Sequence, residues 1–412
     1  MDILYTCCAG LDVHKLTVVA CFRRVDAGGK VHKEVRTFET TTRGLLALAD
    51  WLRAEKVTHA AMESTGVYWK PVFNILEDQV QLILVNAQHI KQVPGRKTDV
   101  KDCEWIAQLL QVGLLRASFV PPAPIRDLRE LTRQRVQLLG EKSAAANRIQ
   151  KVLEDANIKL ASVATDVLGV SGRAILEALI AGQTNPVQLA ELAQKSLRRK
   201  IPELRLALEG KVTANHRFLL RMLLDHVRHQ EELVERVTAR IEELMIPFAP
   251  AMQKLQTIPG VGQKVAEVLL AEIGPDMSVF PSAEHLSSWA GMSPGNNQSA
   301  GKRHSGRTTK GSHWLRSMLV QAAWAASHTK GTYLADQYRR LASRRGKKRA
   351  LIAVGHTILV IAYHVLKKGI PYAELGADYL ARLDPERVTR NLVRRLERLG
   401  HKVTLEPTRD AA

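Results

Sequence analysis

The order of strand and helix patterns in the first 95 residues limits the fold of this chain more than any other feature. Three apolar or alternating segments follow one another with short turns between them, at residues 3–15, 15–24 and 30–40. Helical and strand patterns then alternate, at residues 42–55, 57–64, 66–78 and 80–87. Because short turns join antiparallel strands and helices join parallel ones, we expect an antiparallel meander extended by alternating helices and strands.

This order of elements is that of the ribonuclease-H-like fold, and it puts two acidic residues at strand ends. Asp12 follows the apolar run of the first strand, and Glu63 lies on the fourth strand. Ligands of α/β sheets gather at the ends of strands. We therefore expect Asp12 and Glu63 to converge on one edge of the sheet.

Two further acids, Asp99 and Asp102, lie three residues apart where a helical pattern begins, at about residue 100. Side chains at this spacing lie on one face of a helix, so the two carboxylates repel each other. One interpretation is structural: Asp99 caps the helix and Asp102 is solvated in its first turn. The other is that the pair supplies hard oxygen ligands to Mg²⁺. The second interpretation gains weight from Asp12 and Glu63.

The charge of the chain points to a polyanionic partner. Lys and Arg number 60 against 41 Asp and Glu, which gives a formal net charge of +19. Residues 301–350 alone hold 13 basic residues and one acid, Asp336. A basic excess of this kind is typical of proteins that bind nucleic acid. The run at residues 339–349 suits a sugar-phosphate backbone, although such a run is more often a solvated helix face.

Cysteines and apolar segments favour an intracellular protein. The four cysteines form no CxxC pair and no zinc-type spacing, so we expect reduced core residues at Cys7, Cys8, Cys21 and Cys103. The first residues show no basic-then-apolar signal pattern. The longest apolar run, at residues 351–366, contains two histidines and is short for a bilayer. We expect a buried helix there, no membrane contact and a cytoplasmic location.

A long helical region follows a proline-rich linker at residues 121–127. Residues 127–245 carry few strand or turn signals and break mainly at 182–186. Spacings of three and four, typical of a coiled-coil seam, run through Leu219, Leu223, His226, Gln230, Leu233, Val237, Ile241 and Leu244. A looser apolar set at residues 128–152 is its candidate partner. The two sets could pair antiparallel within the chain or join two protomers.

The segment after a boundary at residues 246–250 contains Ile-Pro-Gly-Val-Gly between two helical patterns. This pattern is typical of a helix-hairpin-helix, in which backbone amides freed by Gly260 and Gly262 bind a phosphate without reading sequence. The alternative is a tight turn between helices that binds nothing.

A polar, basic segment at residues 293–312 cannot form a core, and a helical pattern follows it from about His313. A serine in such a glycine-flanked loop is a candidate nucleophile. Spacing alone does not rank the candidates, which are Ser293, Ser299, Ser305 and Ser312. A polar loop that only touches DNA phosphates would explain the same residues.

Together these segments resemble a transposase of the insertion-sequence one-ten family, the DEDD transposases related to Piv-type DNA invertases. The resemblance rests first on the acidic motifs, GLDVHK with Asp12, MESTGVYW with Glu63, and KTDVKDCEWIAQLL with Asp99 and Asp102. It continues through IPGVGQKVAEVLLAEIG and WAGMSPGNNQSAGKRHSGRTTKGSHWLR, and it covers about residues 5–370. Each motif alone is weakly specific, and the combination is highly specific.

The resemblance implies a RuvC-like N-terminal domain whose four acids bind divalent metal, a helical coiled-coil region, and a transposase domain with a serine nucleophile. In the family's Pro-x-x-x-x-Ser-x-Gly pattern the matching serine is Ser299, five residues after Pro294. Ala300 stands where glycine is common beside that serine. Family members act as oligomers on DNA of the mobile element and its target, and those studied in most depth are guided by a structured non-coding RNA.

We therefore predict an α/β plus α protein in four parts. These are a ribonuclease-H/RuvC-like catalytic domain at residues 1–124, a helical coiled-coil region at 125–248, a mainly α transposase domain with a helix-hairpin-helix at 249–372, and a charged appendage at 373–412. The predicted function is DNA transposition and recombination by metal-dependent strand cleavage and exchange, with a transient phosphoserine link at Ser299.

The predicted catalytic residues are Asp12, Glu63, Asp99, Asp102 and Ser299. The four acids would hold two Mg²⁺ ions, replaceable by Mn²⁺, which stabilise charge on the attacked phosphate and on the leaving oxygen. The predicted partners are DNA of the element ends and target, a guide RNA, and further copies of the chain in a dimer or tetramer at the bacterial nucleoid. The residues predicted to contact nucleic acid are Gly260, Gly262, Lys264, Lys302, Arg303, Arg307, Lys310, Arg344, Arg345, Lys347 and Lys348.

Two other functions fit parts of the pattern. A RuvC-like, structure-specific DNA endonuclease would use metal-activated water, with Ser299 only binding phosphate, and would form no covalent protein–DNA species. A non-catalytic nucleic-acid-binding protein would bind DNA without metal and without cutting it. Four placed carboxylates argue against the latter.

Overall fold

The computed structural model describes residues 3–26, 28–64, 66–87, 90, 102–295, 297–305, 307–308 and 310–406, and for residues 297–299 and 303–305 it describes the backbone alone. The chain divides into two compact units, Met1–Val120 and Pro121–Ala412. The finer division into four parts at residues 124, 248 and 372 stays a prediction.

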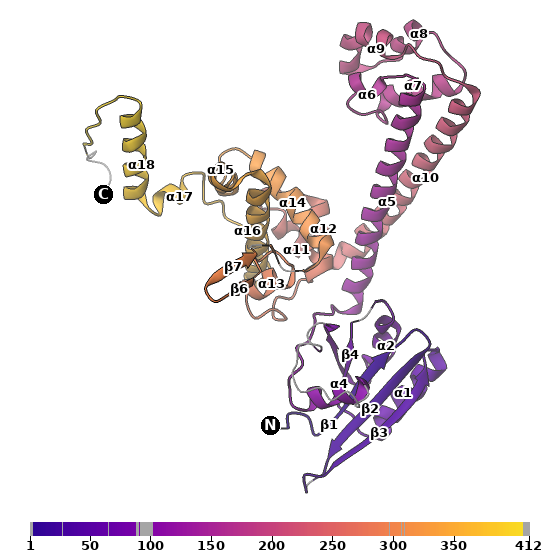
Figure 1. Ribbon diagram of the computed structural model, residues 1–412, viewed down its shortest axis with the longest axis vertical. Helices are drawn as coiled ribbons and strands as arrows, with labels where there is room; N and C mark the ends of the chain where they lie inside the picture. The colour runs from indigo at the N-terminus through magenta and orange to yellow at the C-terminus, as the bar shows by residue number, and fades with distance from the viewer. Residues whose placement is uncertain are drawn as a thin grey trace. The chain divides into compact units, whose positions relative to one another are not determined.

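The first unit is built on a five-stranded sheet with the strand order β3-β2-β1-β4-β5 (Figure 1). Its strands are β1 (Cys7–Val13), β2 (Thr17–Val25), β3 (Val31–Glu39), β4 (His59–Glu63) and β5 (Gln81–Val85). Strands β1, β2 and β3 pair antiparallel, and β4 and β5 extend the sheet in parallel from β1. The expected meander, followed by strands that alternate with helices, is confirmed.

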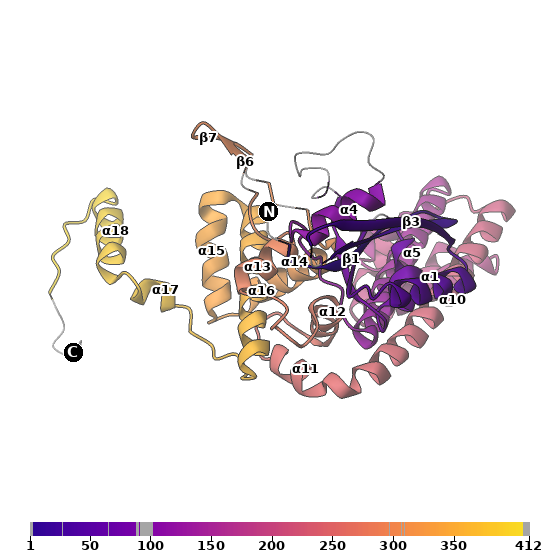
Figure 2. The ribbon, with the colours of Figure 1, turned by 90° about the horizontal axis from the view of Figure 1, so that it is seen from below.

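Helices cover both faces of this sheet (Figure 2). Helices α1 (Thr42–Ala54) and α2 (Trp69–Leu76) lie on one face, and α4 (Asp102–Gln111) lies on the other. Side chains alternate along a strand, so Leu11 of β1 packs with α1 and α2, while Cys8, three residues earlier on the same strand, packs with α4. The four cysteines are buried and form no disulfide, as predicted.

The second unit begins with two long helices, α5 (Ala123–Asp155) and α10 (Ala214–Met245), which pack side by side (Figure 1). The end of α5 meets the start of α10, because Asp155 pairs with His216 at 2.9 Å, so the helices run antiparallel. Shorter helices close the far end: α6 (Leu160–Val163), α7 (Val170–Ile180), α8 (Pro186–Glu191), η1 (Lys195–Lys200) and α9 (Ile201–Ala207). Pairing within the chain, one of the two alternatives, is therefore observed.

Two details of the predicted helical region are wrong. Over the first half of α10 the contact face with α5 runs through Leu220, Leu224 and Val227, one residue later than the predicted seam, and His226 is exposed. The periodicity fits both registers because apolar residues occur in neighbouring pairs. The predicted linker at residues 121–127 is mostly helical, since α5 starts at Ala123 directly after its N-cap, Pro122.

Among the described residues, the regular secondary structure of the rest of the second unit is helical apart from one hairpin. Its elements are η2 (Ile246–Phe248), α11 (Ala249–Leu255), α12 (Gln263–Ile273), α13 (Ala283–Trp289), β6 (Asn297–Ser299), β7 (Lys302–Ser305), α14 (His313–His328), α15 (Tyr333–Arg345), α16 (Lys347–Lys368), α17 (Tyr379–Arg382) and α18 (Pro385–Arg398). Helix α16 is long and apolar enough to cross a membrane by length and composition. It packs against α11, α13, α14 and α15, as a buried core helix does.

Candidate functional site

Three of the four predicted acids gather at one edge of the first unit, and we call Asp12, Glu63 and Asp102 the acid edge. The parallel pairing of β1 with β4 aligns Leu11 with Met62, so Asp12 and Glu63 come next on neighbouring strands. Both are half-buried at the ends of their strands. Asp102 is the first residue of α4, on the face of the sheet that Asp12 shares with Cys8. Asp99 lies outside the described residues.

Gly10 allows α4 to approach the sheet closely enough to form this edge. A Cβ atom on Gly10 would lie 2.2 Å from the Cys103 carbonyl oxygen and 2.4 Å from the Ala107 amide nitrogen. The α4 backbone therefore rests directly on the β1 backbone. Asp12 lies two residues beyond this contact on the strand, and Asp102 one residue before it on the helix.

The carboxylates of the acid edge influence one another electrostatically. Burial raises the pKa of the Asp12 carboxyl above its ordinary value, and the negative charges of Asp102 and Glu63 raise it further. His14 acts in the opposite direction through its charge and its hydrogen bond to Asp12. Asp12 is therefore an acid whose ionised form is costly until a positive charge compensates it.

His14 was not among the predicted site residues. Its Nε2 atom lies 3.1 Å from Oδ2 of Asp12, and the imidazole is largely exposed. The usable signal was the two-residue spacing, because residues at i and i+2 of an extended segment lie on one face. Gly10, Asp12 and His14 share that face.

The donor set suits a hard divalent cation. Carboxylate oxygens are the ligands that Mg²⁺ prefers, and a bound cation would offset the burial and the neighbouring negative charges that together raise the Asp12 pKa. Among the described residues, no three His, Cys, Asp or Glu side chains stand close enough to hold one ion. Electrostatic interactions act over longer distances than coordination bonds. The carboxylates are therefore close enough to affect the Asp12 pKa but not close enough to coordinate one ion together. The chemistry of the residues fits the metal.

The predicted polar loop of the second unit is a β-hairpin, which we call the serine hairpin (residues 297–305) (Figure 2). Ser299 pairs with Lys302 across a two-residue turn. Ala300 and Gly301 in that turn have φ of +48° and +75°, which is the conformation that tight hairpin turns require. The loop was expected because its composition cannot form a core, but backbone pairing needs no core. Ser299 is thus the last strand residue before the hairpin tip.

The base of the serine hairpin is held by pairing between its two flanking segments and by the packing of Gly311 against the end of α13. The Gly295 amide donates to the Arg307 carbonyl at 2.7 Å, and Pro294 bridges to Thr308. A Cβ atom on Gly311 would lie 2.3 Å from the Ala290 carbonyl carbon, so the backbone just before α14 packs closely against the C-cap of α13. These contacts hold both ends of the hairpin without a core.

Ser312, another of the candidate serines, has a structural role. Its Oγ accepts a hydrogen bond from the Leu315 amide at 3.3 Å and caps α14. It also donates to Oε2 of Glu272, a fully buried carboxylate on α12, at 3.1 Å. The Arg133 guanidinium on α5 donates to both oxygens of Glu272, at 2.8 and 2.9 Å. A buried ion pair thus ties the end of the hairpin segment to two helices.

The predicted phosphate-binding turn lies between α11 and α12. Gly260, with φ of +83°, faces α14, because its Cβ would lie 2.3 Å from the Ala322 carbonyl oxygen. Gly262 and Lys264 are exposed at the start of α12, with open space around Gly262. Gly260 therefore serves packing, and the accessible part of the turn is Gly262 to Lys264.

The other predicted nucleic-acid contacts are mainly surface cations. Lys302, Arg307 and Lys310 are exposed around the serine hairpin. The side chain of Arg303 lies outside the described residues. At the corner between α15 and α16 four cations are exposed together: Arg344, Arg345, Lys347 and Lys348.

Comparison with known protein families gives a match in each half of the chain. Residues 9–158 match the model of the IS110 DEDD transposase, and residues 252–339 match the model described as transposase of the IS116/IS110/IS902 family. Together the matches cover more than half of the chain. The chain belongs to the IS110 family of transposases. The DEDD transposases are in general dependent on divalent metal. Asp12, Glu63, Asp99 and Asp102 fall within the first match, and Ser299 within the second.

The names of similar proteins are consistent with membership of this family. The pilin gene-inverting proteins of Moraxella bovis and Moraxella lacunata are each 34% identical over 157 residues, which is 36% of this chain. The match spans 48% of each of them, about half of their length. A Sinorhizobium fredii protein that carries a transposase name, y4pF/y4sB, is 24% identical over 326 residues, 77% of this IS110-family chain and 75% of its own.

Proposed function

We propose that this chain is a DNA recombinase of an insertion sequence, which cuts and rejoins strands during transposition. The observation that carries the proposal is the acid edge: Asp12, Glu63 and Asp102 converge from a strand, a second strand and a helix. Burial raises the Asp12 pKa, and the negative charges of Asp102 and Glu63 raise it further. Such a costly grouping needs a compensating cation. The family match and the DNA-inverting name of the Moraxella relatives support strand exchange as the reaction.

In this proposal Asp12, Glu63, Asp99 and Asp102 hold Mg²⁺, with two ions when the site is full and Mn²⁺ as a substitute. The bound metal supplies positive charge that stabilises the attacked phosphate and the leaving oxygen. The chain itself orients the ligands: Gly10 sets the distance between α4 and β1, and the aligned ends of β1 and β4 set the spacing of Asp12 and Glu63. His14 holds the Asp12 carboxylate from the solvent side.

Ser299 is the proposed nucleophile. Its Oγ forms a bond to the phosphorus of a DNA phosphodiester, the bond from phosphorus to one sugar oxygen breaks, the serine proton goes to a base, and the leaving oxygen is protonated. The reverse reaction on another strand rejoins DNA, so no ATP is consumed. The position beside the hairpin turn supports this role, because a residue there can reach a phosphate without the rest of the helical unit. Residues 293–312 contain no acid, so the base comes from elsewhere.

The remaining parts of the proposal concern partners. Exposed cations around the serine hairpin and at the α15–α16 corner would contact phosphates of element and target DNA. A structured guide RNA, assembly into a dimer or tetramer, and action at the nucleoid in the bacterial cytoplasm follow from the family resemblance. The RuvC-like identity of the first unit has the same basis, together with its strand order.

Substitution of single acids tests the metal site. Asp12→Asn and Asp102→Asn should each lower strand cleavage and joining by about a thousandfold or more, because each removes a ligand that acts in the transition state. Folding should persist, since each change removes repulsion. Cleavage and joining are measured on end-labelled DNA across a Mg²⁺ titration. Wild-type rates in both variants at limiting Mg²⁺ would show that the site is misassigned.

The pH dependence gives a second readout of the same site. Metal binding needs ionised Asp12, and its raised pKa means that protonation begins at a higher pH than for an ordinary aspartate. The Mg²⁺ concentration for half-maximal activity should therefore rise as the pH falls toward that pKa. A Mg²⁺ requirement that stays constant across mildly acidic pH would contradict this placement of Asp12.

A further inference from the structure

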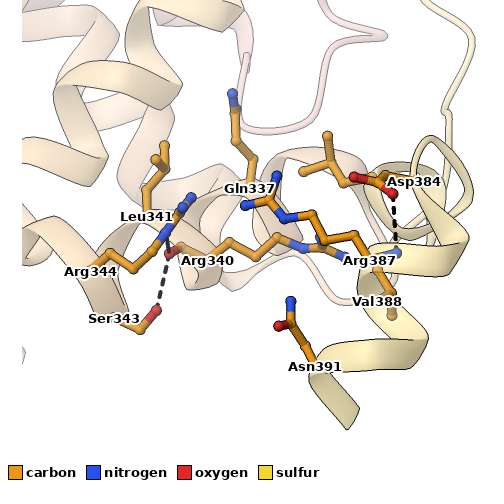
Figure 3. Close-up of a pocket in the computed structure, with 10 residues that line it drawn as sticks. Gln337, Arg340, Leu341, Ser343, Arg344, Asp384, Arg387, Val388 and Asn391 are labelled. Atoms are coloured by element: carbon orange, nitrogen blue, oxygen red, sulfur yellow. Dashed lines mark hydrogen bonds between the residues drawn. The ribbon is translucent and has the colours of Figure 1, made fainter. Parts of the chain in front are cut away.

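A second basic site lies between α15 and α18, and its arginines lie outside both segments that match family models. A cavity of about 600 Å³ is lined from α15 by Arg340 and Arg344 and from α18 by Arg387 and Asn391 (Figure 3). Figure 3 shows Arg340 extending from α15 toward α18 and Arg387 extending from α18 toward α15. The matched family segment ends at residue 339, so all four residues belong to sequence outside it.

The segment that leads into α18 is fastened to the start of α15. Oε1 of Glu374 accepts hydrogen bonds from the Tyr333 amide at 2.8 Å and from the Gly376 amide at 2.9 Å. The Tyr379 ring on α17 stands edge-on to the Tyr333 ring at 5.6 Å. These contacts join the first turn of α15 to the segment that leads into α18.

The cavity has more positive charge than the protein neutralises. Arg340 is satisfied by Asp336, with 2.6 Å between Nε and Oδ2. Asp384, the acid in the lining, accepts the Arg387 backbone amide at 3.1 Å and caps α18. Within the described chain, no carboxylate pairs with the guanidinium of Arg344 or Arg387. Two unneutralised guanidinium groups, together with the amino-terminal end of α18, therefore give a concave surface that attracts an anion.

The shape of the surrounding charge suits a polymer of phosphates. Arg344 belongs both to the cavity and to the exposed corner formed with Arg345, Lys347 and Lys348. On α18, Arg394 and Arg398 follow Arg387 by seven and eleven residues, so they lie on its helix face, and all three are exposed. Exposed basic side chains thus extend from the cavity in two directions, toward the α15–α16 corner and along α18. A single small anion would not contact so long a row of cations.

We propose that the α15–α18 cavity binds a backbone phosphate of duplex DNA, so that the carboxy-terminal appendage is part of the DNA-binding surface. The guanidinium forks of Arg344 and Arg387 donate to phosphate oxygens, and the Asn391 amide adds a neutral donor. This inference rests on the proposed function, which makes DNA the substrate.

The test compares two charge-matched variants of the full chain in binding to a short duplex of mixed sequence. Arg387→Gln should raise the Kd about tenfold at roughly 0.1 M salt and lower the slope of log Kd against log salt by about 1, because one phosphate contact is lost. Arg236→Gln removes the same charge from an exposed position on α10, outside the cavity and outside the basic run at residues 339–349. It should change the Kd by less than about twofold and leave the slope unchanged.

Asn391→Asp is an independent probe that keeps the side-chain shape and puts a negative charge where the phosphate would lie. It should weaken duplex binding at least as much as Arg387→Gln. An unchanged Kd in this variant overturns the proposal, whether or not Arg387→Gln folds. A loss confined to structured RNA also overturns it, because the cavity would then serve RNA.

Strand joining by the wild-type chain is measured beside binding, so that the two failures can be separated. If the wild-type chain joins strands, and Arg387→Gln and Asn391→Asp bind duplex DNA as tightly as wild type, the cavity proposal is overturned and the proposed function is left intact. Absence of duplex binding by wild type at low salt would overturn both. The expected result is weaker duplex binding in Arg387→Gln and Asn391→Asp but not in Arg236→Gln.

Discussion

The acid edge and the serine hairpin are positioned by different physics. The acids sit at the ends of buried strands and on a helix whose backbone touches the sheet at Gly10, so core packing fixes them. The serine hairpin has no core, and its place depends on backbone pairing and on contacts at its base. The first arrangement suits a metal site that needs fixed ligands. The second suits a nucleophile that must meet a DNA strand.

This difference predicts where each region is fragile. The acid edge should lose its geometry, and with it strand cleavage, when backbone packing is disturbed. It should tolerate changes of solvent-exposed side chains. The serine hairpin should lose its attachment to the helices when the buried Glu272 is removed. Its stability should also change when residues of its turn are replaced.

Gly10→Ala should have the largest effect. Its Cβ would lie 2.2 Å from a backbone carbonyl oxygen, which no rotamer change can relieve. We expect a loss of about 3 kcal/mol or more in the unfolding free energy of the first unit, with loss of strand cleavage. Urea unfolding and cleavage assays measure the two. Gly28→Ala, whose Cβ would meet its nearest atom at 3.4 Å, is the matched control and should change little. Equal stability of Gly10→Ala and Gly28→Ala would show that close packing of α4 on β1 does not hold the acid edge in place.

Glu272→Ala should have the next largest effect, in the second unit. It leaves the Arg133 charge without its partner and removes the acceptor for Ser312, so we expect a loss of about 3 kcal/mol. Arg129, whose pKa burial lowers to about 10, also loses a nearby compensating charge. The control is Glu243→Ala, which removes an exposed partner of Arg240 and should cost less than about 0.5 kcal/mol. A small effect of Glu272→Ala would mean that other contacts hold the hairpin base.

Ala300→Asn should have a small effect of the opposite sign. Ala300 holds φ of +48°, which asparagine adopts at lower cost than alanine, so the hairpin should gain about 0.5 kcal/mol. Gly301→Ala, at φ of +75°, should lose about 1 kcal/mol. Amide hydrogen exchange across the Ser299–Lys302 pair measures both. Unchanged exchange in the two variants would show that the turn does not control the hairpin.

The sequence was most informative where periodicity and packing agree. The strand order, the placement of Asp12 and Glu63 at strand ends, and the apolar face of α4 follow from alternation and helical spacing. The register of α10 could not be chosen, because paired apolar residues allow two seams and only contact with α5 decides between them. The serine hairpin escaped prediction because its pairing comes from the backbone. The roles of Gly10 and Glu272 depend on neighbours that are distant in sequence, so no local pattern marked them, whereas the two-residue spacing from Asp12 could have pointed to His14.

The most direct measurement of the central claim is a denaturant trap of the reaction with labelled DNA. The wild-type chain should carry DNA that survives denaturation, through a bond to Ser299. Ser299→Ala and Asp102→Asn should carry none, while Ser312→Ala, which alters the cap of α14 instead, should still form the adduct at a reduced level. An adduct that persists in Ser299→Ala would contradict the account, as would DNA cleavage by wild type with no trapped adduct at any time.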